Sequence, residues 1–429
     1  MTSSVKFSEI AELVMGQSPK GADCNETGDG FPLLNGPTEF TERSPLPVQF
    51  TTAGKKFSKT GDILFCVRGS TTGRMNYADQ AYAIGRGIGA IRGINGYPTA
   101  YIRAVLEHNL DRLLVAATGS TFPNVGKDLL NNFEVNVCSP EQAQQANKLL
   151  VGIEDKRYLN SQTNQTLEEM AQAIFKSWFV DFDPVKAKIN GDKPEGMDEA
   201  TASLFPEKLV ESELGLIPEG WEVGTLDSHT SMIIDHRGKT PKKLGSDWVE
   251  EGYPAISAKN IKSKKIVRPD TIRFIDEATY KKWMKEPLIK GDIIMTSEAP
   301  MGELYFFDGS EDFCLSQRLY GLRANSDVCS PEFLFNWLQT TKAKADMEGR
   351  ASGTTALGIK QAELRKVKIL TPPLELLEKY SAVASNLVDM AAKNNAQNTV
   401  LEDLRDTLLP KLLSGEIELG QAQELAEVE

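Results

Sequence analysis

Two long segments of the chain carry apolar residues at the spacing of a helix. In the second segment, alternating steps of three and four residues run through Leu377, Tyr380, Ala384, Leu387, Ala391, Asn394, Asn398 and Leu401. Such steps keep side chains on one face of an α-helix. Neither segment contains Gly or Pro apart from Gly152 and Pro410, and each opens directly after a proline, as helices often do. The pattern predicts helices from Glu141 to about Phe179 and from Leu374 to about Leu413.

The same stripe occurs 234 positions earlier, through Ala143, Ala146, Leu150, Ile153, Arg157, Asn160, Asn164 and Leu167. This spacing is the a/d seam of a coiled coil, which two helices would share. Amides in a seam reduce stability but fix its register, because a slipped pairing leaves them without partners. The alternative is a surface helix with exposed asparagines. The predicted seam residues are Leu150, Ile153, Asn160, Asn164, Leu167, Leu387, Asn394, Asn398 and Leu401.

The rest of the sequence predicts short strands and turns, and parts of it occur twice along the chain. Runs such as Asp62–Val67 and Glu303–Phe307 are rich in β-branched and aromatic residues and are bounded by turn residues. The string Gly61–Leu64 returns as Gly291–Ile294, offset by 230 positions. Further matches follow in the same order, among them Ile91-Arg92 with Leu322-Arg323 and Ala117–Thr121 with Ala351–Thr355. A near-constant offset over ordered landmarks predicts a tandem duplication.

These patterns predict an α+β chain with two duplicated globular domains, each followed by a long helix. A length of 429 residues is also too great for one ordinary core. After Phe182-Asp183-Pro184 the sequence becomes charged and rich in small residues, which favours a linker. The predicted ranges are 1–140 for the first domain, 141–185 for its helix, 186–215 for the linker, 216–373 for the second domain and 374–429 for the C-terminal helix and tail.

The net charge of −12 conceals an uneven distribution. Segments 141–215 and 374–429 are acidic, whereas residues 1–140 contain 13 basic and 13 acidic side chains. Residues 237–290 hold 14 Lys and Arg against 7 Asp and Glu. A local basic excess of this kind is typical of a surface that contacts nucleic acid.

Cysteine and histidine usage narrows the chemistry and the compartment. The 5 cysteines are scattered without a C-x-x-C pair, and only 3 histidines occur. A disulfide framework, a structural zinc site and a histidine-rich metal site are therefore not expected, and the cytoplasm is the expected location. No apolar run approaches the ~18 residues that span a bilayer, and the N-terminus lacks the features of a signal peptide. We expect no membrane association.

No catalytic group of residues stands out. Gly85–Gly89 is a G-x-G-x-G string without a following helix, which favours a strand with a close backbone approach over a phosphate loop. Walker A and G-x-S-x-G strings are absent, as is the Asn/Asp-Pro-Pro-aromatic tetrapeptide of amino-methyltransferases. Glu154-Asp155-Lys156 resembles part of a nuclease site but falls inside the first helix, where a solvated face is expected. The chain is predicted to bind rather than to catalyse.

Clustered polar and basic residues are the candidate contacts to nucleic acid. Arginine can bridge guanine O6 and N7, asparagine can pair with adenine, and hydroxyls and lysines can contact phosphates. The alternative is a solvated lysine-rich surface. The predicted contacts are Lys55, Lys56, Arg68, Ser70, Thr71, Thr72, Arg74 and Asn76 in the first copy, and Lys239, Lys242, Lys243, Lys259, Asn260, Lys262, Lys264, Lys265, Thr354, Thr355 and Lys360 in the second.

Three stretches resemble one known family. Residues 167–184, which include the string AQAIFKSWFVDFDP, are similar to the central conserved helix of type I restriction–modification specificity subunits. Residues 215–224 and 401–417 are similar to other parts of the same family. The resemblance covers essentially the whole chain, because the order of segments in that family is also duplicated.

The resemblance implies a non-catalytic, sequence-specific subunit. Two target-recognition domains would each read one half of a split, asymmetric site on double-stranded DNA, and two antiparallel helices would separate them as a coiled-coil spacer. Two methyltransferase (M) subunits and restriction (R) subunits would be its partners. No cofactor is expected in this chain; S-adenosylmethionine and ATP with Mg²⁺ would belong to the partners. Because recognition domains vary within the family, the resemblance identifies no base-reading residue.

The helix ends hold more apolar residues than one seam needs. We assign the surplus to packing with the recognition domains and with methyltransferase partners, and the predicted partner contacts are Phe175, Trp178, Phe179, Phe182, Leu412 and Leu413. Purely intramolecular packing is the alternative. Two other functions remain to be distinguished: a coiled-coil scaffold that does not bind DNA, and a solitary methyltransferase, which would need the glycine loop and tetrapeptide that are missing.

Overall fold

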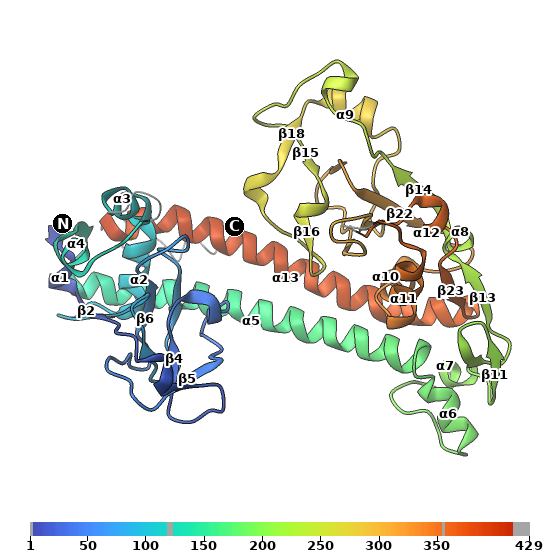
Figure 1. Ribbon diagram of the computed structural model, residues 1–429, viewed down its shortest axis with the longest axis horizontal. Coiled ribbons are helices and arrows are strands. Elements are labelled where there is room, and N and C mark those ends of the chain that lie inside the picture. Colours follow the sequence, from blue (N-terminus) through green and yellow to red (C-terminus); the bar gives the residue numbers. More distant parts are fainter. Residues whose placement is uncertain (1–2, 118–122, 354–356, 415–429) are drawn as a thin grey trace. The chain divides into compact units, whose positions relative to one another are not determined.

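The computed structural model describes residues 3–117, 123–353 and 357–414. The chain divides into two compact units, here called the first unit (residues 1–163 and 393–429) and the second unit (residues 164–392). Helices α5 (Pro140–Phe179) and α13 (Leu374–Ser414) each contribute to both units (Figure 1). They are the two long helices that the apolar stripe predicts, and their existence is confirmed.

The first unit holds a globular part, the first domain (residues 3–137). Its central antiparallel sheet has the order β2–β9–β6–β7, formed by Ala11–Met15, Ile88–Gly93, Ile63–Cys66 and Met75–Tyr77. A second sheet has the order β3–β5–β4–β8, formed by Cys24–Asn25, Gln49–Thr51, Phe31–Leu34 and Ala83–Ile84, with β4 and β8 parallel. Strand β1 (Ser3–Lys6) pairs with β10 (Glu134–Val137). Helices α1 (Phe7–Ile10), α2 (Thr99–His108), α3 (Leu110–Ala116) and α4 (Lys127–Asn132) complete the domain.

The second unit contains the second domain (residues 222–371), which repeats this plan. Its central sheet has the order β14–β22–β19–β20, formed by Thr230–Asp235, Leu319–Ala324, Ile293–Thr296 and Leu304–Phe306. The next sheet has the order β18–β15–β21, formed by Arg273–Ile275, Tyr253–Ile256 and Cys314–Leu315, again with one parallel pair. Further elements are the pair β13 (Glu222–Thr225) and β23 (Lys368–Thr371), the hairpin β16 (Ile261–Lys262) and β17 (Lys265–Ile266), and α8 (Leu226–His229), α9 (Glu277–Trp283), α10 (Pro331–Trp337), α11 (Thr341–Arg350) and α12 (Gln361–Leu364).

The duplicated strings form the same ion pair in both domains. Arg92 Nη2 lies 2.7 Å from Asp62 Oδ2, and Arg323 Nη2 lies 2.8 Å from Asp292 Oδ2. The Asp62 and Asp292 side chains are 3% and 1% exposed. A buried carboxylate requires a paired cation, which is why the Gly-Asp-Ile string recurs together with an arginine about 30 residues later. The match of Ala117–Thr121 with Ala351–Thr355 falls largely outside the described residues.

The segment predicted to be a linker is folded. It contains the end of α6 (Asp183–Ile189), α7 (Glu199–Ser203) and β11 (Leu209–Ser212), which pairs with β12 (Gly215–Pro218). Phe205 is buried, and its ring lies 5.5 Å from the ring of Trp178. The expectation failed because a few apolar anchors are enough to dock a segment whose average composition is charged and rich in small residues.

The seam asparagine of α5 pairs with α13 inside the first unit. Asn160 is 2% exposed, and its Nδ2 donates to Asn398 Oδ1 and Gln397 Oε1, both at 2.9 Å. Arg157 forms an ion pair with Glu402. As residue numbers increase along α5, the numbers of the contacting residues in α13 decrease, so the helices are antiparallel in this unit. Of the other predicted seam residues, Leu150, Ile153 and Leu167 are buried, and Asn164, Leu387, Asn394, Asn398 and Leu401 are half-buried.

The cysteines are free thiols, and four of the five are buried. Burial raises the pKa of the Cys314 and Cys329 thiols to about 12, so both are unreactive. Across the described residues no helix has the length and apolarity needed to cross a membrane. The same residues contain no cluster of His, Cys, Asp and Glu that could hold a metal ion.

Candidate nucleic-acid interface

Most candidate contacts of the first domain gather at one end of its central sheet. Cys66 N donates to Arg74 O and Val67 N donates to Gly87 O, both at 2.9 Å, which joins the loop 67–74 to the loop 85–87. Ile84 N donates to Lys56 O at 2.9 Å and so adds the loop around residue 56. The side chains of Lys55, Lys56, Arg68, Ser70 and Arg74 are exposed at this end.

The G-x-G-x-G string packs closely against Asn35 at this end of the sheet. A side chain at Gly85 would place its Cβ 2.2 Å from Asn35 Oδ1, and one at Gly87 would place it 2.2 Å from Asn35 O. The close backbone approach predicted for this string is confirmed, but residues 85–87 form a turn between β8 and β9 and not a strand. Asn35 accepts a hydrogen bond from Ser18 Oγ (3.1 Å) and donates to Gln49 Oε1 (3.3 Å). Sequence reasoning did not select these three polar residues, nor the exposed Arg86 beside them, because separate strands bring them together.

The second domain presents the equivalent end of its sheet. Ser297 N donates to Arg318 O (2.8 Å), as Val67 does to Gly87 O in the first domain. Ser316 N donates to Ile256 O (2.8 Å), which brings the following loop with Lys259 alongside. Strand β14 ends here too, since Asp235 pairs with Tyr320 at the start of β22. Exposed basic side chains around this end are Arg237, Lys242, Lys243, Lys259, Arg318 and Lys360.

The predictions that the side-chain amides of Asn76 and Asn260 contact DNA bases are wrong. Asn76 is 1% exposed, and its side chain accepts from Thr41 N (3.1 Å) and donates to Thr41 O (2.9 Å). Asn260 is fully buried, and its side chain accepts from Ser257 N (3.1 Å) and donates to Thr271 Oγ1 (3.0 Å). Both amides pin loops of their own domain, a frequent use of Asn in turns. Neither can reach a base.

Three further candidates also have partners within the fold. Lys239 Nζ donates to Trp283 O (2.8 Å), and burial lowers its pKa. Lys264 forms an ion pair with Glu168 of α5. Thr72 Oγ1 donates to Pro123 O (2.9 Å). These side chains serve packing, whereas Thr71 is half-buried, Lys262 and Lys265 are exposed on the β16–β17 hairpin, and Thr354 and Thr355 lie outside the described residues.

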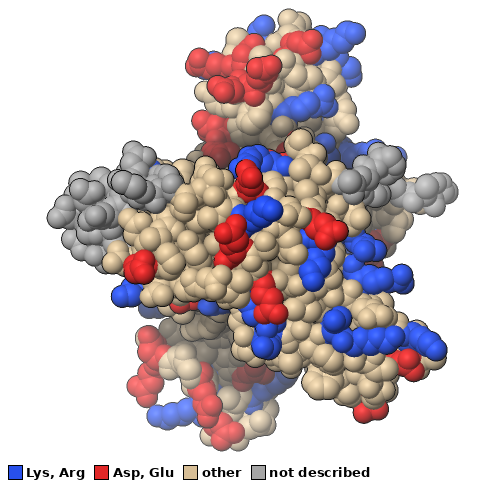
Figure 2. Space-filling view, turned by 90° about the vertical axis from the view of Figure 1, so that its left-hand side faces the viewer, with Lys and Arg blue, Asp and Glu red and all other residues tan. Residues whose placement is uncertain are grey.

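On the face drawn in Figure 2, basic and acidic side chains of the described residues are interspersed rather than gathered in one patch. The candidate interface is defined by the sheet ends, whose loops carry the exposed basic residues.

The apolar residues assigned to methyltransferase contacts are buried inside the units, so that prediction is wrong. Phe175, Trp178, Phe179 and Phe182 belong to the core of the second unit, where the rings of Phe179 and Tyr380 lie 5.1 Å apart. Leu412 and Leu413 belong to the core of the first unit. The apolar residues beyond those needed for one seam pack against the domains at the helix ends.

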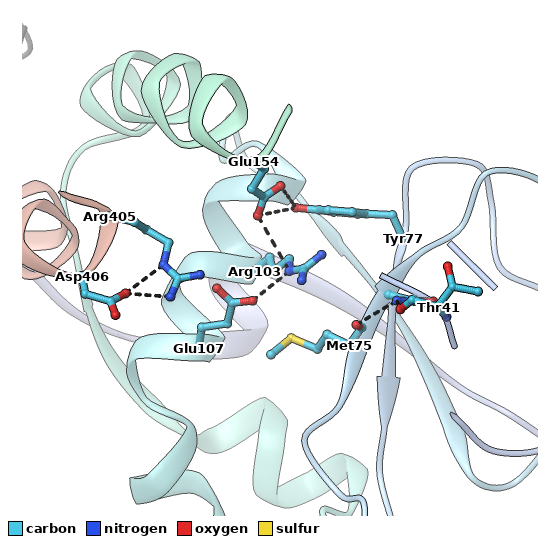
Figure 3. Close-up of polar contacts among 9 residues, drawn as sticks. Thr41, Met75, Tyr77, Arg103, Glu107, Glu154, Arg405 and Asp406 are labelled. Atoms are coloured by element: carbon cyan, nitrogen blue, oxygen red, sulfur yellow. Dashed lines mark hydrogen bonds and ion pairs between the residues drawn. The ribbon is translucent and has the colours of Figure 1, made fainter. Parts of the chain in front are cut away.

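Glu154, expected on a solvated face, instead joins α5 to the first domain. Its Oε2 accepts from Tyr77 OH (3.1 Å), and its Oε1 lies 3.9 Å from Arg103 Nε, which binds Glu107 at 2.9 Å (Figure 3). The neighbouring Asp155 forms an ion pair with Arg43 of the same domain at 2.6 Å. A polar network thus fixes how the first domain sits on its helix.

The second domain meets its helices without this network. Phe306 occupies the register position of Tyr77, because it faces Ile293 as Tyr77 faces Ile63. Its ring packs edge-on against Phe335 of α10 at 5.3 Å.

The polar contacts of the second domain to α13 are made elsewhere. Glu332 accepts from Ser381 Oγ and Ser385 Oγ, and Asn336 Nδ2 donates to Tyr380 OH. The duplicated domains therefore share a fold but contact their helices through different residues.

The Glu154 network predicts a pH-dependent stability. Burial raises the pKa of the Glu154 carboxyl above its usual range, although the nearby Arg103 opposes the shift. The folded chain then takes up a proton more readily than the unfolded chain, and the stability from this group is lost as the pH rises through the folded pKa. Relative to Glu154→Gln, the wild type should therefore gain stability as the pH falls from 7 to about 4. Thermal unfolding midpoints of both proteins over this range test the expectation, and a constant difference would contradict it.

A family model described as the type I restriction modification DNA specificity domain matches the sequence twice, over residues 3–169 and 218–402. The chain belongs to this family. The two matches fall on the two copies of the duplicated fold. The resemblance found in the sequence is confirmed, and DNA recognition is the function of a specificity subunit of this family.

Individual relatives are specificity subunits as well. The subunit of the type I restriction enzyme HindI of Haemophilus influenzae is 27% identical over 427 residues, covering 88% of this chain and 90% of that one. The MjaVIII specificity subunit of Methanocaldococcus jannaschii is 24% identical and covers 96% and 92%. The crystal structure of a type I S subunit from M. genitalium superposes with a TM-score of 0.58 at 16% identity over 96% of both chains, which shows a shared fold. The predicted α+β fold with duplicated domains and long helices is confirmed.

Proposed function

We propose that this chain is the sequence-specific subunit of a type I restriction–modification complex and that it reads a bipartite, asymmetric site on double-stranded DNA. One observation carries the proposal: the same sheet end carries exposed basic loops in both domains, but the loop residues differ between them. Arg68 of the first domain corresponds to Glu298 of the second, since each follows the Gly-Asp-Ile strand and forms the equivalent bridge, to Asn124 and Gly358 respectively. Two copies of one fold with different loops suit two different half-sites.

Two methyltransferase (M) subunits and restriction (R) subunits are the proposed partners, and the chain itself would catalyse nothing. S-adenosylmethionine and ATP with Mg²⁺ would be bound by those partners, in the cytoplasm. Because the apolar residues at the helix ends are buried, the methyltransferase partners would instead contact exposed apolar residues along α5 and α13. Leu159 and Met170 of α5 and Met390 and Val400 of α13 are 58%, 48%, 49% and 54% exposed.

A coiled-coil scaffold without DNA affinity is the competing function. It accounts for the seam of α5 and α13, but it gives no reason for two copies of a domain with exposed arginines and lysines at the same sheet end. DNA binding by the complex of this chain with its methyltransferase partner separates the two functions.

Replacing Arg68 and Arg74 with alanine should weaken binding of that complex to its own site. The loss should be about 1–3 kcal/mol if either arginine contacts a base through two hydrogen bonds. The measurement is a titration with a duplex that carries the sequence methylated in a host expressing the complex.

Lys6→Ala with Lys148→Ala is the matched control, because it removes the same charge from exposed positions on β1 and α5. Equal losses in both double variants, or no loss in either, would contradict the assignment of this loop. A wild-type complex that binds no duplex would favour the scaffold.

A further inference from the structure

The second domain holds an arginine at the candidate interface in a defined orientation. Arg318 Nε and Glu298 Oε1 form an ion pair at 2.8 Å, and both side chains are about half exposed. Within the described residues the Arg318 side chain has no other polar partner, and it is 53% exposed. The pair lies at the sheet end, because Arg318 O accepts from Ser297 N, next to Glu298.

Arg237 and Arg323 of this domain differ in this respect. Arg237 binds Asp235 through Nε and Nη2, at 2.9 and 2.7 Å, and lies over the ring of Tyr320. Arg323 is bound twice by the buried Asp292. Their donors are directed into the protein, whereas Arg318 is held through Nε alone.

The backbone at Arg318 supports a functional reason for the residue. Its φ is 64°, in the left-handed region that disfavours residues with a Cβ. A pair as exposed as Arg318 and Glu298 contributes little to stability. What the pair provides is the orientation of a guanidinium.

We propose that Arg318 is a specificity-determining residue of the second domain, which reads a guanine through two parallel hydrogen bonds from its terminal amino groups to O6 and N7. This inference rests on the proposed function. Arginine bridging guanine is the commonest specific contact in the major groove. Glu298 is then a positioning residue that presents the guanidinium edge and reduces the conformational freedom lost on binding.

The test uses the complex with the methyltransferase partner and a panel of duplexes in which each base pair of its site is changed singly. Arg318→Ala should bind the original duplex roughly 10- to 100-fold more weakly. The variant should lose discrimination at one G·C pair, in one half-site, and keep it at every other position. Arg318→Lys should discriminate less than the wild type at the same pair, because lysine keeps the charge but lacks the planar fork.

Variants of Glu298, alone and combined with Arg318→Ala, test whether Glu298 acts through Arg318. Glu298→Gln, which keeps an acceptor, should discriminate nearly as well as the wild type, and Glu298→Ala should discriminate less. In the Arg318→Ala background, Glu298→Ala should have no further effect on discrimination. Because both side chains are half exposed, all variants should unfold at the temperature of the wild type.

Several results would overturn the inference. If Arg318→Ala weakens binding to every duplex by the same factor, and Arg318→Lys restores it, the residue contacts a phosphate. Unchanged binding by Arg318→Ala would show that it touches no DNA. A wild-type complex that binds all duplexes equally would overturn the proposed function itself, and this inference with it.

Discussion

Replacing Asp292 with alanine should lower the free energy of unfolding by about 3 kcal/mol. The carboxylate is 1% exposed, accepts from Arg323 Nε (2.9 Å) and Nη2 (2.8 Å), and also accepts from Ile289 N (2.9 Å). Its removal leaves the guanidinium of Arg323 only the carbonyl of Pro287, at 2.8 Å, among its described partners. A partly buried cation and a backbone donor that lose their acceptor are costly.

Urea unfolding followed by circular dichroism measures this effect, with Glu277→Ala as the control. Glu277 pairs with Lys281 on the surface of α9, and both side chains are more than half exposed. Loss of such a pair should cost well under about 1 kcal/mol. Similar shifts of the urea midpoint in the two variants would show that the duplicated Asp–Arg pair is not a structural requirement.

Inserting four residues after Thr163 should change the spacing of the DNA site without changing its two halves. The boundary between the two units falls between residues 163 and 164 of α5. Four helical residues add about 6 Å and about 40° of rotation, so the unread gap should lengthen by one or two base pairs at ~3.4 Å per pair. The loops at the sheet ends are untouched, which is why the half-sites should stay the same.

A matching insertion after Ala392 of α13 is the control for helix pairing. The single insertion shifts the α5 seam relative to α13, whereas the double insertion lengthens both helices together and keeps the bond from Asn160 to Asn398. The double variant should therefore be the more stable of the two. Methylation of the original spacing by either complex would show that the helices do not set the gap.

The sequence was sufficient to predict features that repeat along the chain. The helices α5 and α13 could be predicted because burying one stripe of a helix requires apolar residues every three or four positions. The duplication could be predicted because a buried Asp62 or Asp292 requires an arginine partner, so the two strings are kept together. Both signals are local or periodic.

Features that depend on long-range pairing could not be predicted. Asn76 is buried because Thr41, 35 residues away, binds its amide, and nothing in the local sequence distinguishes it from an exposed asparagine. Arg86 and Arg318 were not selected as candidates, because their positions at the sheet ends follow from strand pairing. Glu154 looked like a solvated residue because Tyr77 and Arg103, its partners, are distant in sequence.

Selection of bound duplexes from a random DNA library, with the intact complex of this chain and its methyltransferase partner, tests the central claim most directly. Two domains that each read one half-site predict two short blocks of fixed sequence, different from one another and separated by an unread gap of constant length. A single continuous block, two identical blocks, or no enriched sequence would contradict the account.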